Sequence, residues 1–202
     1  MIAIIDYGVG NLFSLKSSFS AIGFETVVTG DAEVIRSADK LILPGVGAFG
    51  DASKKLKESG LDVVVKEQVA LGKPLLGVCL GMQMLFEKSL EYGEYEGLGL
   101  LNGQVVPFDL PKEYKIPHIG WNALIFNKQS PLLKYVSEGD CVYFVHSYHA
   151  VGCEDSLIAT CEYGTSVTGL VGKGNVYGCQ FHPEKSGDVG LKILKAFCEI
   201  GE

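Results

Sequence analysis

One cysteine of this chain lies where its side chain could act as a nucleophile. Cys79 occupies the centre of a Gly-x-Cys-x-Gly pattern, between an apolar run at 74–78 and a helical pattern at 80–88. This is the cysteine form of the nucleophile elbow, a sharp strand-to-helix turn that needs small neighbours and points the side chain out above a sheet. The helix start beside the sulfur favours the reactive thiolate. For the motif taken alone, a buried and unreactive cysteine is the alternative.

A cysteine nucleophile needs a base, and the base needs a group that orients it. Of four histidines, His182 follows an expected strand at 176–180, and a single proline separates it from Glu184. In an extended segment, residues two apart share a side, so the Glu184 carboxylate can hold one imidazole nitrogen and leave the other for the thiol. Alone, the motif could also be a surface histidine beside an unrelated glutamate. The predicted triad is Cys79, His182 and Glu184.

Acyl transfer also needs donors for the oxyanion that forms on the attacked carbonyl group. The backbone N–H of Leu80, the residue after the nucleophile, is one expected donor. The second is expected from Val46 or Gly47, in a Pro-Gly-Val-Gly segment at 44–47 that follows another apolar strand. Without Cys79, this segment would be interpreted as an ordinary turn before a helix.

Strands and helices alternate along the first half of the chain. Apolar strands are expected at 2–5, 25–29, 40–43 and 74–78, and helices at 11–22, 49–58, 61–71 and 80–88. This alternation predicts a parallel sheet covered on both faces. Ligands bind such sheets at the carboxyl ends of the strands, so Asp6, the 44–47 segment and Cys79 should meet at one edge.

The second half is richer in short strand patterns separated by turn residues. They lie at 103–108, 121–126, 141–147, 157–163, 167–171 and 176–180, before an amphipathic helix at 189–198. Their closeness in sequence predicts an antiparallel or mixed extension of the sheet. We therefore expect one α/β domain over residues 1–202, with a mostly parallel central sheet, helices on both faces and an antiparallel extension.

Composition limits the classes of function. The chain has 202 residues, of which 47% are hydrophobic and 20% charged, with a net charge of −7. Such a chain can bury a substantial core, and without a cluster of lysine and arginine it does not resemble a nucleic-acid binder. No apolar run reaches the roughly 18 residues that a membrane span needs.

Cysteine and histidine spacing predicts no metal site. None of the six cysteines forms a Cys-x-x-Cys pair, and the chain starts directly with a strand-like run. We therefore expect free thiols in a reducing cytoplasm. His118, His146 and His149 match no zinc pattern, so we expect them to be structural or interface residues. No cofactor is expected.

Taken together, the motifs resemble a known family. Residues 77–83, followed far downstream by Gln-Phe-His-Pro-Glu at 180–184, are similar to the signature of the triad (class I) glutamine amidotransferases. Five further segments resemble one branch of that family, the glutaminase subunits of imidazole glycerol phosphate synthases. These segments are residues 6–12, 44–49, 117–122, 143–148 and 182–186.

The resemblance implies a class I glutamine amidotransferase-like fold that hydrolyses glutamine to glutamate and ammonia. It also implies a heterodimer with a (β/α)8-barrel cyclase, through which the ammonia would pass to a second active site. There it would be used to make imidazole glycerol phosphate and an aminoimidazole-carboxamide ribonucleotide in histidine biosynthesis. If the peptide of Val46 must flip to aim its N–H at the oxyanion, the free subunit would be nearly inactive until the partner and its nucleotide bind.

The resemblance also implies roles for individual residues. Those expected to contact the glutamine are Gln83, Glu91, Ser147 and Tyr148, and the alignment of Glu91 depends on a loop. Those expected to face the partner are Trp121, Asn122, Tyr143 and Lys185. Structural alternatives are a core position for Trp121, a half-wet strand position for Tyr143 and a solvated charge for Lys185.

Three other functions stay open. An amidotransferase subunit of a surface-sugar pathway would have its own barrel partner. A stand-alone cysteine hydrolase of the same fold, such as a peptidase or a gamma-glutamyl hydrolase, would need no partner. A binding module without activity is disfavoured because Cys79, His182 and Glu184 are all present.

Overall fold

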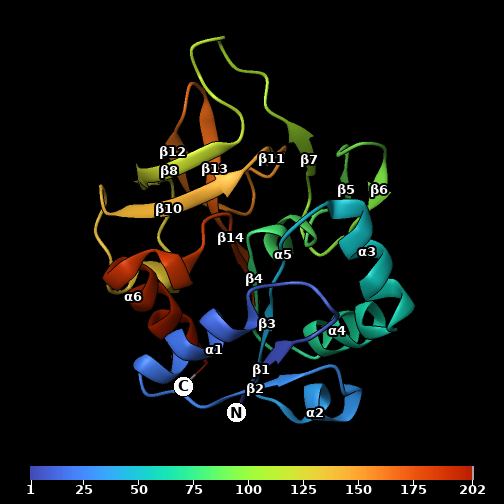
Figure 1. The fold of residues 1–202 in the computed structure, drawn as a ribbon. Helices are drawn as coiled ribbons and strands as arrows, with labels where there is room; N and C mark the ends of the chain where they lie inside the picture. Colours follow the sequence, from blue (N-terminus) through green and yellow to red (C-terminus); the bar gives the residue numbers. More distant parts are fainter. Residues whose placement is uncertain (202) are drawn as a thin grey trace.

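The computed structural model describes residues 1–201 and is built around an eight-stranded sheet with the order β2-β1-β3-β4-β14-β13-β12-β9 (Figure 1). Its strands are β1 (Ile2–Ile5), β2 (Thr26–Thr29), β3 (Lys40–Leu43), β4 (Leu75–Val78), β9 (Ile125–Phe126), β12 (Leu157–Glu162), β13 (Ser166–Lys173) and β14 (Val176–Cys179). Pairing is parallel from β2 to β14 and antiparallel from β14 to β9. The predicted fold class is confirmed.

Helices cover both faces of the sheet because its parallel strands are apolar on both sides. They are α1 (Leu12–Ala21), α2 (Ala32–Ser37), α3 (Phe49–Glu58), α4 (Leu61–Ala70), α5 (Leu80–Gln83) and α6 (Gly187–Cys198). Ile2 and Ile4 of β1 belong to a buried cluster with α1 and α6, whereas Ala3 and Ile5 belong to a second cluster with α2, α3 and α4. Within residues 1–201, no helix is long and apolar enough to cross a membrane. That the whole chain is one domain stays a prediction, which the shared central sheet supports.

The second half of the chain differs from expectation, because several of its strands form two smaller sheets. Strands β8 (His118–Ala123) and β10 (Cys141–His146) pair as an antiparallel ribbon, hereafter the β8–β10 ribbon. Strands β5 (Lys88–Ser89), β6 (Tyr95–Glu96), β7 (Gln104–Pro107) and β11 (Tyr148–Val151) form the other sheet. The ribbon is a separate sheet, and Val142 and Phe144 of β10 pack into the first buried cluster beneath it. On its outer face Ile119 and Trp121 are exposed, and Tyr143 is half-buried.

The predicted helix at 80–88 is wrong in length, since α5 ends at Gln83. The amides of Leu85 and Phe86 bond three residues back, and the carbonyl of Met84 accepts from the N–H of Leu98 at 2.7 Å. The chain then enters β5. Periodicity could not show this ending, because Met84, Leu85 and Phe86 are buried in the second cluster just as helix residues would be. The short helix also offers Cys79 a smaller dipole than a two-turn helix would.

Three loops meet at the carboxyl edge of the parallel strands, as expected from the topology. The hydroxyl of Tyr7, just after β1, donates to the carbonyl of Pro44 at 2.7 Å. A Cβ atom on Gly45 would lie 2.6 Å from the backbone nitrogen of Gly81, and one on Gly81 would overlap the carbonyl oxygen of Leu43. The backbones after β3 and β4 therefore pack directly against each other, and glycine is required at the contact.

We predict that Gly81→Ala destabilises the fold by about 3 kcal/mol or more, because the new methyl group overlaps backbone atoms that cannot move independently. Gly60→Ala is the control. Gly60 has φ +71° but open space around its Cα, so its replacement should cost only about 1 to 2 kcal/mol of backbone strain. Urea unfolding of both variants measures the difference, and equal losses would show that the contact at Gly81 is not tight.

Candidate active site

Cys79 has a strained backbone. Its φ of 54° and ψ of −112° place it among the two non-glycine residues within 1–201 that have positive φ. Such a conformation costs of the order of 1–3 kcal/mol and persists only where the surroundings enforce it. The Cys79 N–H donates to the carbonyl of Cys179 at 2.8 Å, and a Cβ atom on Gly77 would lie 2.7 Å from the carbonyl of Gly81. The geometry is that of the expected elbow.

His182 and Glu184 form a buried pair. Nδ1 of His182 lies 2.8 Å from Oε1 of Glu184, and their side chains are 3% and 1% exposed. The contact agrees with expectation, but its backbone does not. His182 itself is extended, whereas 183–185 form a 3-10 turn, η2, in which the N–H of Lys185 donates to the carbonyl of His182 at 3.0 Å. Proline favours such a turn at its start as readily as it favours an extended segment.

The protonation of His182 is set by its partners. Burial alone would lower the pKa of its imidazole, but hydrogen bonds to Cys79 and Glu184, together with the charges of both groups, raise this pKa to about 10. A histidine that stays protonated beside a sulfur favours the imidazolium–thiolate form. The contact therefore places a group that can carry a proton directly beside the sulfur of Cys79.

A cavity of about 400 Å³ opens above Cys79. Its wall includes Cys79 and His182, the three residues expected at the oxyanion hole and the four expected to contact glutamine. Glu184 is not in the wall and lies behind His182. Lys185, expected to face a partner, also lines the cavity, as do three residues to which no site role was assigned: Pro117, Val145 and His146. All three fall within the motif segments 117–122 and 143–148, which are the one sequence signal that could have indicated them.

Two residues expected to contact glutamine have side chains that are hydrogen-bonded to backbone groups. The Gln83 side chain donates from Nε2 to the carbonyl of Tyr148 at 3.0 Å. Oε2 of Glu91 accepts from the N–H of Phe49, the first residue of α3, at 2.8 Å. Burial raises the pKa of Glu91, and the hydrogen bond from Phe49 acts in the opposite direction. Glu91 therefore connects the cavity to the end of the 44–48 loop.

Buried histidines join the β8–β10 ribbon to the cavity wall. Nδ1 of His118 lies 3.1 Å from Nε2 of His146, whose Nδ1 lies 2.8 Å from the carbonyl of Tyr148. Nε2 of His118 lies 2.7 Å from Oδ1 of Asn122. Burial lowers the pKa of His146 to about 3, although its hydrogen bond to Tyr148 acts in the opposite direction. These contacts are structural, as expected for His118 and His146.

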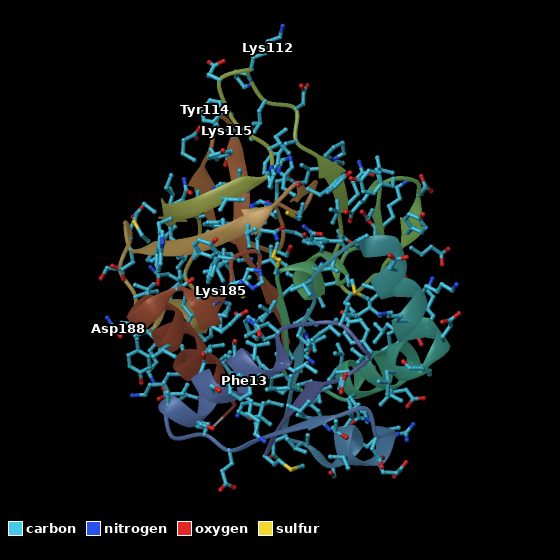
Figure 2. The ribbon with its side chains drawn as sticks, in the orientation of Figure 1. Phe13, Lys112, Tyr114, Lys115, Lys185 and Asp188 are labelled. Carbon is cyan, nitrogen blue, oxygen red and sulfur yellow. The ribbon has the colours of Figure 1, made fainter. Side chains whose placement is uncertain are left out.

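The outer face of the ribbon carries exposed aromatic surface. Trp121 is 56% exposed and packs edge-on against Tyr143, with ring centroids 5.9 Å apart. Asn122, in contrast, directs its amide inward and donates to the carbonyl of Glu162 at 3.0 Å. Lys185 lies between the ribbon and α1 in the view of Figure 2. The partner contacts expected of these residues stay predictions.

The ribbon is directly connected to the histidine loop. The carbonyl of Tyr143 accepts from the N–H of His182 at 3.0 Å, and the N–H of Tyr143 donates to Oγ of Ser186 at 2.9 Å. Ser186 in turn donates to the carbonyl of His182 at 2.6 Å. A movement of the ribbon would therefore be transmitted to His182 through backbone hydrogen bonds.

Comparison with known proteins gives consistent results. Residues 3–200 match the family described as glutamine amidotransferase class-I. The chain is 54% identical over 199 residues to the imidazole glycerol phosphate synthase subunit HisH of Lactococcus lactis subsp. lactis, covering 98% of each chain. It is 52% identical to the protein of the same name from Caldanaerobacter subterraneus subsp. tengcongensis, covering 99% of this chain and 98% of that one.

Solved structures with low identity share the fold. A crystal structure of a glutamine amidotransferase has a TM-score of 0.76 at 21% identity, covering 98% of this chain and all (100%) of that one. The structure of PurLQS from Thermotoga maritima has a TM-score of 0.77 at 20% identity, covering 98% and 96% of the two chains.

We predict that His149 makes the protein sensitive to acid. Its ring stacks on Phe108 with centroids 4.5 Å apart, and burial lowers its pKa. Below about pH 6.5 the unfolded chain binds a proton at this residue that the folded chain does not, so stability falls by up to about 1.4 kcal/mol per pH unit. Urea unfolding between pH 7 and pH 5 should show a smaller loss for His149→Phe than for the wild type. Equal losses would contradict the assignment, since His118 and His146 are present in both proteins.

Proposed function

This chain belongs to the class I glutamine amidotransferases and, within them, to the HisH subunits of imidazole glycerol phosphate synthase, and we propose that it hydrolyses glutamine through a triad of Cys79, His182 and Glu184. The observation that carries the triad is the convergence of a strained elbow cysteine and a buried histidine–carboxylate pair on one cavity. Covalent acyl transfer by a cysteine needs a nucleophile, a base within its reach and a group that orients the base.

In the proposed reaction, the thiolate of Cys79 attacks the side-chain amide carbon of glutamine. The imidazolium of His182 gives its proton to the departing ammonia, and a glutamyl thioester forms. His182 then takes a proton from water, whose oxygen attacks the thioester carbon; the carbon–sulfur bond breaks and its electron pair returns to Cys79. Glu184 holds the imidazole and stabilises its charged form.

The oxyanion would be held by the Leu80 N–H and by an N–H from Val46 or Gly47. Loss of one such donor typically costs about 3 kcal/mol of barrier. Glu91 supplies a carboxylate in the cavity wall, which suits the α-ammonium group of the substrate. Gln83, Ser147 and Tyr148 would complete the glutamine contacts.

The 44–47 loop supports a regulatory role for one peptide. Gly45 is fixed by its contact with Gly81, whereas Gly47 has φ +92° with open space around it, and Val46 is 40% exposed. Rotation is therefore easiest at the peptide between Val46 and Gly47. We propose that this peptide turns its N–H to the oxyanion when the partner and its nucleotide bind, so that glutamine is not wasted by the free subunit.

A (β/α)8-barrel cyclase is the proposed partner, docked on the face that carries Trp121, Tyr143 and Lys185. The backbone contacts between Tyr143 and His182 give this face a direct connection to the triad. Ammonia would pass into the barrel and be used to form imidazole glycerol phosphate and an aminoimidazole-carboxamide ribonucleotide. The names of the relatives favour this histidine pathway over a surface-sugar pathway.

Glutamate release from glutamine tests the proposal. We expect little release by the purified chain alone and strong stimulation by the cyclase with its nucleotide ligand. Cys79→Ala should lower the stimulated rate by about a thousandfold or more. Cys153→Ala, which replaces a cysteine outside both the cavity and the ribbon strands, should not.

Three outcomes would contradict parts of this account. Absence of release under every condition would exclude glutamine hydrolysis. A rate that the cyclase does not change would exclude the proposed partner and favour a different synthase, or a stand-alone hydrolase if gamma-glutamyl peptides are also cleaved. An unchanged rate in Cys79→Ala would exclude the triad.

A further inference from the structure

Gln180 contacts the sulfur at which the reaction would take place, yet the mechanism above gives it no role. It follows β14 directly and is 0% exposed. Its backbone N–H donates to the carbonyl of Gly169 at 2.9 Å, which fixes where the side chain begins. Nε2 of that side chain donates toward Sγ of Cys79 at 3.8 Å. A neutral amide thus lies beside the nucleophile, in addition to His182.

Neighbouring groups determine which end of the amide faces the sulfur. The carbonyl of Tyr148 can only accept a hydrogen bond, so the nitrogen of Gln83 must face it, at 3.0 Å. The second hydrogen of that nitrogen goes to Oε1 of Gln180 at 2.9 Å. Gln180 must then present its nitrogen to Cys79, because a flip of either amide would bring two acceptors or two donors together.

The series of hydrogen bonds from Tyr148 through Gln83 and Gln180 therefore presents an N–H donor to the sulfur of Cys79. A donor favours the anionic form of its partner, and hydrogen bonds to an ionised acceptor are about twice as strong as neutral ones. These hydrogen-bonded groups are buried except where they border the cavity. In such low-dielectric surroundings each hydrogen bond is stronger, and successive bonds polarise one another. The sulfur is anionic twice in the reaction: before attack, and again when the thioester breaks.

We propose that Gln180 is a catalytic residue that donates an N–H to the sulfur of Cys79 and stabilises the thiolate. This inference rests on the proposed function and adds a second donor to the one supplied by His182. During deacylation the electron pair of the carbon–sulfur bond returns to a sulfur that already faces this donor. No additional proton is transferred, because the amide keeps its hydrogen throughout.

The same arrangement determines how Gln83 meets the substrate. Both hydrogens of its nitrogen are used, one by Tyr148 and one by Gln180. The group that Gln83 can offer to a ligand is therefore its oxygen, an acceptor. A substrate N–H on this oxygen would polarise the amide of Gln83 and, through it, strengthen the donor that Gln180 directs at the sulfur.

The test is the pH dependence of alkylation of Cys79 by iodoacetamide, with peptide mass spectrometry to follow that cysteine alone. Gln180→Met keeps the length and burial of the side chain but removes the donor. We expect the midpoint of its alkylation profile to move up by about one pH unit, a roughly tenfold loss of thiolate below the midpoint. Gln180→Glu places an acceptor at the same position and should move the midpoint further.

Gln68→Met is the matched control, because Gln68 is also a buried glutamine but lies on α4 outside the cavity. Its midpoint should equal that of the wild type. An unchanged midpoint in Gln180→Met would overturn the inference. Alkylation does not require glutamine hydrolysis, so the inference can fail while the wild type still releases glutamate, or survive if it does not.

A second measurement covers the case in which Gln180→Met does not fold. In the wild type, the side-chain amide resonances of Gln180 in a ¹H–¹⁵N spectrum should move with the same pH midpoint as alkylation of Cys79. They should also move when the sulfur is alkylated. Resonances that respond neither to pH nor to alkylation would show that the amide does not donate to the sulfur.

Discussion

The backbone strain at Cys79 depends on close packing between two loops at the carboxyl edge of the sheet. Gly81 lies against Leu43 and Gly45, and Gly77 lies against Gly81, with no room for a side chain at these contacts. A conformation that costs of the order of 1–3 kcal/mol is held there by backbone on one side and by a hydrogen bond to β14 on the other. The same packing fixes the backbone at Gly45, at the start of the 44–47 loop, whereas Gly47 at its end has open space around it. One constraint thus positions the nucleophile and limits where the oxyanion donor can move.

The parallel pairing of β4 with β14 brings the rest of the site to this point. Val78 and Cys179 are partners in register, so the residues that follow both strands leave the sheet side by side. Gln180 therefore meets Cys79 although they are 101 residues apart in the chain. His182 follows two residues later, and the 3-10 turn brings Glu184 back beneath it. The ribbon strand β10 holds this turn through the backbone of Tyr143, which connects catalysis to the exposed face where a partner is proposed to bind.

Much of this could be predicted from the sequence where local patterns and tertiary structure agree. The bounds of β3 and α3 coincide with those expected, because apolar runs and amphipathic patterns end at clear turn residues there. The helix after Cys79 was predicted too long, because the buried residues after Gln83 keep an apolar pattern while their carbonyls accept hydrogen bonds from the 97–101 segment instead of continuing the helix. The ribbon was predicted to join the main sheet, since alternation shows that one face is buried but not what covers it. The direction of the Gln180 amide depends on Gln83 and Tyr148, which are distant in sequence, so no local pattern could indicate it.

The account as a whole predicts that one cysteine among six is the nucleophile toward glutamine. An electrophilic glutamine analogue, 6-diazo-5-oxo-L-norleucine, tests this directly when it is incubated with the complex of the chain with its cyclase and nucleotide ligand, and the modified cysteine is identified by peptide mass spectrometry. The account predicts one adduct, on Cys79, that glutamine suppresses by competition and that His182→Asn slows. An adduct on a different cysteine, or labelling of Cys79 that glutamine does not suppress, would contradict it.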